Sequence, residues 1–219
     1  MRFTERFRGL KEWTYHILCE GREMKAPAQN GDIAVINRQE PKVYLGWAPS
    51  MLDQTGQIRQ DVSMVVPSIT IMPTQSLGKY TEEKRFDRYN GIHRPQEMGQ
   101  HLGVQFLFSV YEPGVRLPGF VHSAGEKGQD LDLELITEGT EHGFMTLMNW
   151  IDDGMEALVG TRIIPGTDLY VDDESLTYSL YTDQNYVVDR RPVYYGFITC
   201  TFGCYAEPGQ HPELERYLI

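Results

Sequence analysis

Three cysteines, Cys19, Cys200 and Cys204, are the residues best suited to redox or metal chemistry. Cys200 and Cys204 lie in the apolar run VYYGFITCTFGCY, which is typical of a β-strand. In a straight strand they share a face, but their Cα atoms lie about 13 Å apart at about 3.3 Å per residue. A disulfide needs Cα atoms within about 7 Å, and a shared zinc ion needs similar closeness. We therefore expect two reduced cysteines that act as small buried hydrophobic residues, unless Gly203 forms a sharp bulge.

The histidines form no recognised catalytic or metal-binding motif. None lies in an HExxH motif, and the chain has no GxSxG nucleophile elbow. His16 and Cys19 are three residues apart on a predicted helix, so they form either a Cys–His pair or two ordinary neighbours on an amphipathic helix. His93 and His101 lie in a polar segment, where we expect exposed side chains and not ligands. The histidines are His16, His93, His101, His122, His142 and His211.

Carboxylates occur in three clusters, each of which has a structural explanation. Asp130/Asp132/Glu134 is predicted to lie on the wet face of a strand. Asp152/Asp153 is predicted to lie on the solvent side of a helix, and Asp172/Asp173/Glu174 in a turn between strands. None has the spacing and glycine of an EF-hand, and GIHRPQEMGQHLG matches neither phosphate-binding glycine motif. The sequence therefore predicts no catalytic, cofactor-binding or metal-binding residues, and a protein that is not an enzyme. The clusters are Asp130/Asp132/Glu134, Asp152/Asp153 and Asp172/Asp173/Glu174.

Composition and charge exclude several classes of partner. The 219 residues include 31 acidic and 20 basic ones, which gives a net charge of −11. A chain this acidic is a poor ligand for nucleic-acid phosphates, so we expect no specific nucleic-acid binding. Its few cysteines favour a reducing compartment, and charges interrupt the N-terminal apolar residues as they do not in a signal peptide. No apolar run is long enough for a membrane span, so we expect a soluble protein without a membrane partner.

The first half of the chain is predicted to contain one helix and then extended segments. Helical spacing is followed by Phe3, Phe7, Leu10, Trp13 or Thr14, and Ile17, and the helix should end near Gly21. Residues 26–100 contain short apolar runs divided by prolines, such as SITIM between two of them. Because proline removes a backbone donor, we expect edge strands or extended arms there. The polar segment TEEKRFDRYNGIHRPQEMGQHLG, residues 81–103, is predicted to be a surface loop that contacts a partner.

The second half has a more regular pattern. Residues 104–111 and 131–136 alternate as strands, and the helix that follows should end at Gly160. Short hairpin-like strands then lead to the long strand VYYGFITCTFGCY, which is apolar on both faces. Such a strand belongs mid-sheet, covered by the helix on one face and by something else, such as a neighbouring subunit, on the other. The core-facing positions of the helix are predicted to be Phe144, Leu147, Met148, Ile151, Met155 and Leu158.

The expected fold class is α+β, a mixed or antiparallel sheet packed with one main helix, plus an N-terminal helix and Pro-rich extended arms. The chain is long enough for its own hydrophobic core, and we expect a single domain over residues 1–219. Within it, residues 1–25 form the N-terminal helix, residues 26–100 an extended arm or loop insertion, and residues 101–219 the core sheet and helix.

The second half also carries a resemblance. VQFLFSVYEPG is followed by a Gly/Pro-rich excursion, LDLELI, the helix GFMTLMNWIDDGMEALVG, short strands, and VVDRRPVYYGFITCTFGCYAEPG with its Arg-Pro dipeptide. This order of elements resembles the tail terminator, or tail completion, proteins of tailed bacteriophages and related contractile particles. It covers residues 104–209, about half the chain, and rests on element order and not on a diagnostic motif.

The resemblance implies a structural virion protein. Members of this family form a ring, usually a hexamer, that caps the tail tube, contacts the sheath in contractile particles and meets the head connector. The protein would be assembled in the cytoplasm of a host bacterium and reside in the virion tail. An acidic stripe, Asp132 and Glu134, would then face the lumen and repel DNA, or else only add solubility.

Several alternatives stay open. Residues 1–98 exceed what a minimal terminator needs, so another tail, connector or baseplate ring component is one of them. A soluble accessory α+β binding protein and an enzyme with an unrecognised site are the others.

Overall fold

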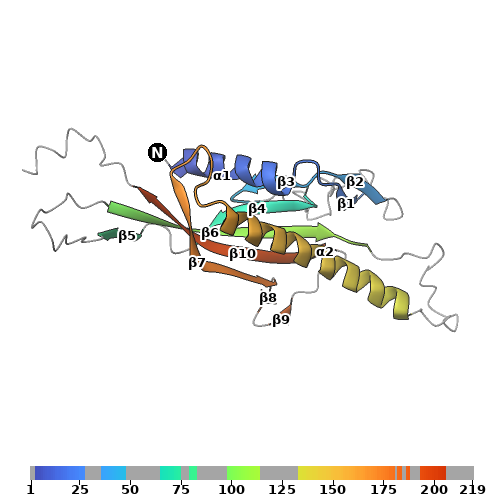
Figure 1. Cartoon of the computed structure of the whole chain (residues 1–219). Helices are drawn as coiled ribbons and strands as arrows, with labels where there is room; N and C mark the ends of the chain where they lie inside the picture. Colours follow the sequence, from blue (N-terminus) through green and yellow to red (C-terminus); the bar gives the residue numbers. More distant parts are fainter. Residues whose placement is uncertain are drawn as a thin grey trace, which may run out of the picture.

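The computed structural model describes residues 3–27, 36–47, 65–74, 79–82, 98–113, 133–180, 182–183, 186–187 and 193–205. Within these ranges the chain forms two helices and ten strands (Figure 1). The helices are α1 (Phe3–Leu18) and α2 (Leu133–Gly160). The strands are β1 (Met24–Pro27), β2 (Ile36–Gln39), β3 (Lys42–Leu45), β4 (Ser68–Pro73), β5 (Lys79–Glu82), β6 (Met98–Tyr111), β7 (Leu169–Leu180), β8 (Thr182–Asp183), β9 (Tyr186–Val187) and β10 (Val193–Tyr205).

A six-stranded mixed sheet forms the centre of the molecule. Its order is β3-β4-β6-β10-β7, and β5 pairs with the start of β6. β3 runs parallel to β4, whereas the other pairs are antiparallel. β6 and β10 pair without interruption from Val193↔Tyr111 to Tyr205↔Gly99. The predicted α+β class and the central position of the long apolar strand are both confirmed.

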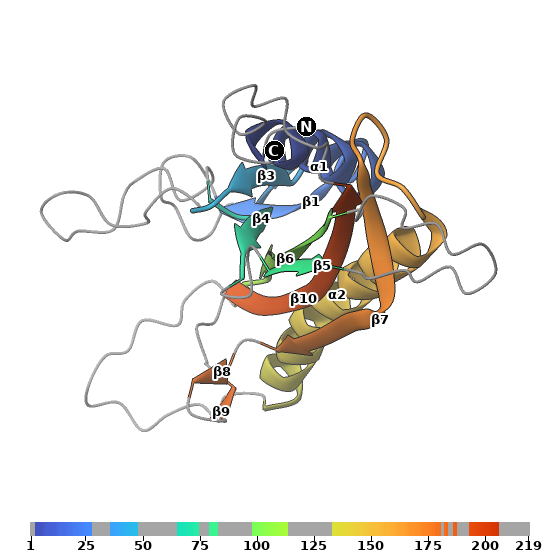
Figure 2. The same ribbon diagram turned by 90° about the vertical axis from the view of Figure 1, so that its left-hand side faces the viewer.

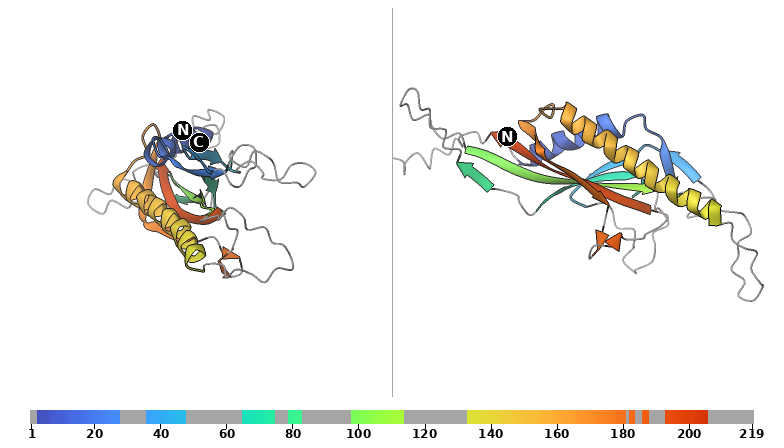
Figure 3. Two further views of the ribbon diagram at one scale, coloured as in Figure 1. Left: turned by 90° about the vertical axis from the view of Figure 1, so that its right-hand side faces the viewer. Right: turned by 60° about the horizontal axis from the view of Figure 1, so that its bottom comes forward.

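Helix α2 crosses β10 and β6 and closes one face of the sheet (Figure 3). Its buried side consists of Gly143, Leu147, Trp150, Ile151, Gly154 and Leu158. The Trp150 ring meets Phe108 edge-on, with 5.2 Å between ring centroids, and its Nε1 donates to the Leu18 carbonyl of α1 at 3.0 Å. The helix ends at Gly160 as predicted, but Phe144, a predicted core position, is 42% exposed. The sequence pattern missed Trp150, which connects α2 to both the sheet and α1.

Helix α1 lies on the same side of the sheet and shares one core with α2 (Figures 1 and 2). Its buried side follows four-residue steps through Arg6, Leu10, Thr14 and Leu18, and Trp13 lies beside them. The helix was expected to bury Phe3 and Ile17, but these are 38% and 55% exposed. The predicted pattern holds for Leu10, Trp13 and Thr14 in the middle of the helix but not for Phe3 and Ile17, which lie in its first and last turns.

Strand β4 corrects the prediction of an edge strand or arm around SITIM. It lies between β3 and β6, and Ile69 and Ile71 are fully buried. The two prolines bound the strand and do not interrupt it. Pro67 precedes β4 and its carbonyl accepts a hydrogen bond from Lys42 N at 3.1 Å, and Pro73 is the last residue of the strand.

The predicted strand over residues 131–136 is wrong, because α2 already begins at Leu133. Leu133 and Ile136 are also three residues apart, so a six-residue alternation fits the first turn of a helix equally well. Acidic residues such as Glu134 favour that first turn through the helix dipole. The acidic strand face proposed to line a lumen is therefore lost, and Asp132 lies outside the described residues.

Two predicted loops contain strand structure. Residues 79–82 and 98–103, at or beside the ends of the polar segment 81–103, pair as β5 and the start of β6, and residues 83–97 lie outside the described part.

The turn predicted at Asp172–Glu174 is a bulge inside one long strand, β7. The register moves from Thr199↔Thr177 to Thr201↔Asp172. Ser175 Oγ fills this gap, since it accepts from Thr201 N at 2.7 Å and donates to the Asp172 carbonyl at 2.6 Å. Figure 2 shows the resulting bend.

We predict that Gly154→Ala destabilises the fold. An added Cβ would lie 2.8 Å from Ile198 Cδ1 and 3.0 Å from Phe108 Cζ, so α2 would move off the sheet. Overpacking of this kind costs about 1–3 kcal/mol, more than the roughly 1 kcal/mol that alanine adds in helix propensity. Urea unfolding measures the loss. Gly160→Ala, whose Cβ would meet nothing within 4 Å, is the control and should leave stability nearly unchanged. Equal stability of both variants would contradict this account of the packing.

Candidate interaction surface

The three cysteines belong to the core. Cys19, Cys200 and Cys204 are 0%, 0% and 1% exposed, and none is in a disulfide. Burial raises the pKa of the Cys19 thiol to about 12 and also raises the pKa of Cys200 and Cys204. The prediction that Cys200 and Cys204 are buried hydrophobic residues is confirmed. The bulge considered at Gly203 is absent, since β10 keeps its register with β6 there; Gly203 instead makes room for the Tyr170 ring.

The structure separates His16 from Cys19. His16 Nδ1 lies 2.8 Å from Glu20 Oε2, and both side chains are more than half exposed. Cys19 faces the core instead. The two residues are therefore neighbours on a helix, and their geometry does not support a Cys–His pair.

The remaining candidate ligands do not converge. His101 is half-buried on β6 and His142 is exposed on α2, whereas His93, His122 and His211 lie outside the described residues. Asp153 pairs with Arg22, and Asp173 is exposed in the β7 bulge. In the part of the chain that the structure describes, no group of three His, Cys, Asp or Glu side chains could hold a metal ion.

One buried ion pair was missed by the sequence analysis. Arg6 is 3% exposed, and its Nε and Nη2 donate to the two Asp168 carboxylate oxygens at 2.8 and 2.5 Å. Burial opposes ionisation of Asp168, but the hydrogen bonds and charge of Arg6 outweigh it and lower the pKa of Asp168 below its ordinary value of 3.8. The pair fixes α1 to the turn before β7. Because 162 residues separate its members, no local pattern could have shown it.

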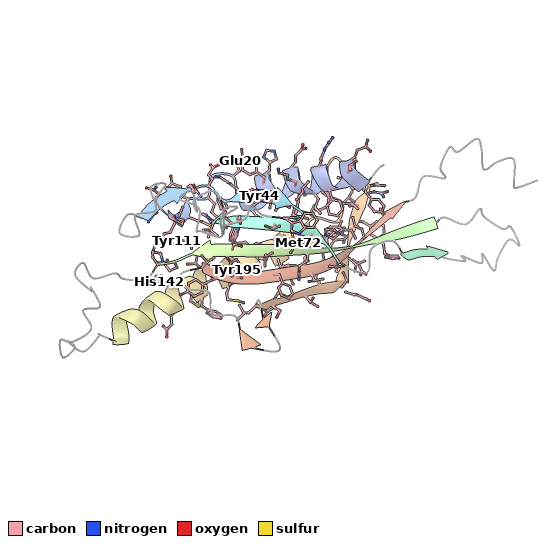
Figure 4. All side chains as sticks on the ribbon, turned by 180° about the vertical axis from the view of Figure 1, so that it is seen from behind. Glu20, Tyr44, Met72, Tyr111, His142 and Tyr195 are labelled. Atoms are coloured by element: carbon pink, nitrogen blue, oxygen red, sulfur yellow. The ribbon has the colours of Figure 1, made fainter. Side chains whose placement is uncertain are left out.

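The face of the sheet opposite the helices is only partly closed, and we call it the outer sheet face. At one end a small second cluster covers it, formed by Val65, Val66, Tyr111, Val193 and Tyr195. Ser68 and Thr70 beside that cluster are 1% and 2% exposed. Beyond them the side chains are half-buried, including Met72, Leu107 and Phe197. Figure 4 shows Tyr44, Met72, Tyr111 and Tyr195 on this side, which no helix of the described residues covers.

The outer sheet face carries no acidic residue on the three central strands. The described side chains that the register places there are Ser68, Thr70 and Met72 of β4; His101, Gln105, Leu107 and Ser109 of β6; and Tyr195, Phe197, Thr199 and Thr201 of β10. Acidic residues begin at the margin, with Asp172 of β7. Seven of these eleven side chains are serine, threonine, glutamine or histidine, and four are apolar or aromatic. In a chain of net charge −11, the face is therefore distinguished by its lack of acidic residues and not by hydrophobicity.

Exposed apolar side chains also occur on one flank of α2, where the exposed Glu141, Asp152 and Glu156 interrupt them, and we call this flank the α2 stripe. Phe144, Met145 and Val159 are 42%, 53% and 52% exposed, and Met148 and Met155 between them are half-buried. The opposite flank of α2 holds Asp153, which pairs with Arg22 after α1. The stripe therefore lies on the side of α2 away from α1.

Comparisons with known proteins give no family. The sequence matches none of the protein-family models, and no curated protein matches it. Neither described helix is both long and apolar enough to span a membrane.

We predict that Asp168→Asn destabilises the protein in a pH-dependent way. The folded pKa of Asp168 is lower than the unfolded one, so its contribution is complete above about pH 4–5 and is lost as pH falls through the folded value. Near neutral pH the variant should lose about 2–4 kcal/mol because the buried Arg6 guanidinium no longer faces the charge of Asp168. Urea unfolding at about pH 7 and about pH 3 should show the difference shrink at the lower pH. Asp173→Asn, in the exposed bulge, should change little; equal stability of D168N and wild type at neutral pH would refute the prediction.

We also predict that the native thiols are inert. All three are buried with raised pKa values, so a thiol reagent at about pH 8 should label none of them in the folded protein and all three after unfolding. Ile17→Cys, at a 55% exposed position, is the positive control and should add one rapidly reacting thiol. Fast labelling of a native cysteine would contradict the prediction and favour the enzyme alternative.

Proposed function

We propose that this protein is a structural component of a phage-like tail, a ring-forming tail terminator that caps the tail tube and joins it to the head connector. The observation that carries the proposal is the one-sided sheet: α1 and α2 cover one face, while the other carries Leu107, Phe197 and Tyr195 and no acidic residue on its three central strands. We infer that this second face is buried against another protein. In this proposal the other protein is a further copy of the same chain.

The order of elements supports the proposal. β6, α2, β7 and β10 follow one another as in the sequence resemblance, with one change: the strand expected before α2 is part of the helix. The segment from β1 to β4 adds two strands to the main sheet and a small hairpin beside it, which a neighbouring connector or baseplate ring component would also accommodate.

Exposed apolar side chains and charge fit the same role. Trp47, directly after β3, is 88% exposed, and exposed tryptophan is a frequent anchor of protein contacts. The net charge of −11 suits a lumen through which DNA passes without binding. The proposed partners are therefore the chain itself, the tail tube, the sheath where one exists, and the head connector. The proposed location is the virion tail, after assembly in the cytoplasm of a bacterial host.

Purified protein should form a closed ring. We expect light scattering to give a multiple of the 25.2 kDa chain, six copies for a hexamer, and negative-stain images to show rings alone or on tail-tube ends. Tubes incubated with an unrelated acidic protein are the control. A protein that stays monomeric and leaves tube ends bare would contradict the proposal.

A further inference from the structure

We propose that the covered end of the outer sheet face is a binding site for a small oxyanion, a phosphate or carboxylate group. The site consists of Lys42 of β3, Ser68 and Thr70 of β4, and Ser109 of β6. The inference does not depend on the proposed ring, because it concerns the end of the face that the second cluster closes and not the half-buried part beyond it.

Two buried hydroxyls point to a ligand at this end. Ser68 and Thr70 are 1% and 2% exposed, and among the described residues neither Ser68 Oγ nor Thr70 Oγ1 makes a hydrogen bond. A buried hydroxyl without a partner costs free energy, and buried polar side chains in folded proteins nearly always have one. The pair therefore indicates a ligand that forms hydrogen bonds with this part of the face.

The strand register aligns further polar groups with Ser68. Ser109 of β6 lies opposite it on one side and Lys42 of β3 on the other, so one ammonium and two hydroxyls form a row across three strands. Neighbouring strands lie about 4.8 Å apart, and Thr70 is about 6.6 Å further along β4, at about 3.3 Å per residue. An anion with several oxygens can accept hydrogen bonds from donors at these spacings, and the ammonium supplies the opposite charge.

Charge favours an anion at this place although the whole chain carries a net charge of −11. The described side chains of the three central strands include no carboxylate on this face. Glu112, directly after β6, is bonded to Lys25, and Glu40, before β3, accepts a hydrogen bond from Tyr15. Among the described residues no carboxylate pairs with Lys42, so its charge is available to an oxyanion.

The second cluster controls access to the row. Tyr111 and Tyr195 lie on this side of the sheet, as Figure 4 shows, and Tyr195 is opposite Ser109 in register. Tyr195 is only half-buried, so its side chain is the part of the cover that can rotate and admit a ligand.

Titration calorimetry with inorganic phosphate, at about pH 7 and constant ionic strength, tests the site. We expect saturable binding, and a parallel titration with acetate separates a phosphate site from a carboxylate site. Thr70→Val and Lys42→Met should each weaken binding about tenfold or more, because each removes a hydrogen bond to a charged group. Thr199→Val, the same change at a half-buried hydroxyl of β10 on the same face, is the matched control and should bind as the wild type does.

The stability of the unliganded protein separates a binding role from a structural one. Thr70→Val removes the unpartnered hydroxyl and keeps the shape of the side chain, so this variant should melt at the wild-type temperature or above it. A lower melting temperature would show that the hydroxyl already has a partner, such as a buried water, and would overturn the inference. The absence of both phosphate and acetate binding, or binding that T70V and K42M leave unchanged, would overturn it as well.

Discussion

The long antiparallel pairing of β6 with β10 is the constraint on which the rest of the structure depends. Side chains alternate across a strand, so this single register places Phe106, Phe108 and Ile198 towards the helices and Leu107 and Phe197 away from them. A slip of one residue would exchange the two faces. Gly143 and Gly154 then let α2 approach the sheet closely, and Trp150 connects that helix to α1.

The same pairing leaves a second face of β10, with Tyr195 and Phe197, that no helix of the described residues covers. Both faces of β10 are apolar, yet in the described residues only one lies under helices and a small cluster closes one end of the other. Burying a leucine or phenylalanine side chain contributes about 1.5–3 kcal/mol, so the half-buried residues of the outer face favour association. Since the chain is strongly acidic, self-association is most favourable through surfaces that lack acidic residues.

The sequence could predict the elements with strong periodicity, namely the central strand, the buried cysteines and the end of α2 at Gly160. It failed where a local pattern permits two structures. Residues 131–136 fit a strand or a first helical turn, and Asp172–Glu174 fit a turn or a bulge. The sequence also could not predict contacts between distant segments. The burial of Arg6 depends on its ion pair with Asp168, and β4 is an interior strand because β3 pairs with its free edge. The sequence predicted the candidate interaction surface only as an unspecified cover for the second face of the central strand. Its composition follows from the strand register, and the α2 stripe follows from the exposed fractions of its side chains.

The central claim is that the outer sheet face is buried by another copy of the chain. Hydroxyl-radical footprinting tests it most directly, by comparing the labelling of Leu107 and Phe197 in the assembled wild type with that in the same protein diluted until light scattering gives the monomer mass. The account predicts strong protection of both side chains in the assembly, while labelling of Ile17 stays the same. Equal labelling of Leu107 and Phe197 in the two samples, with the wild type shown to be oligomeric, would contradict it.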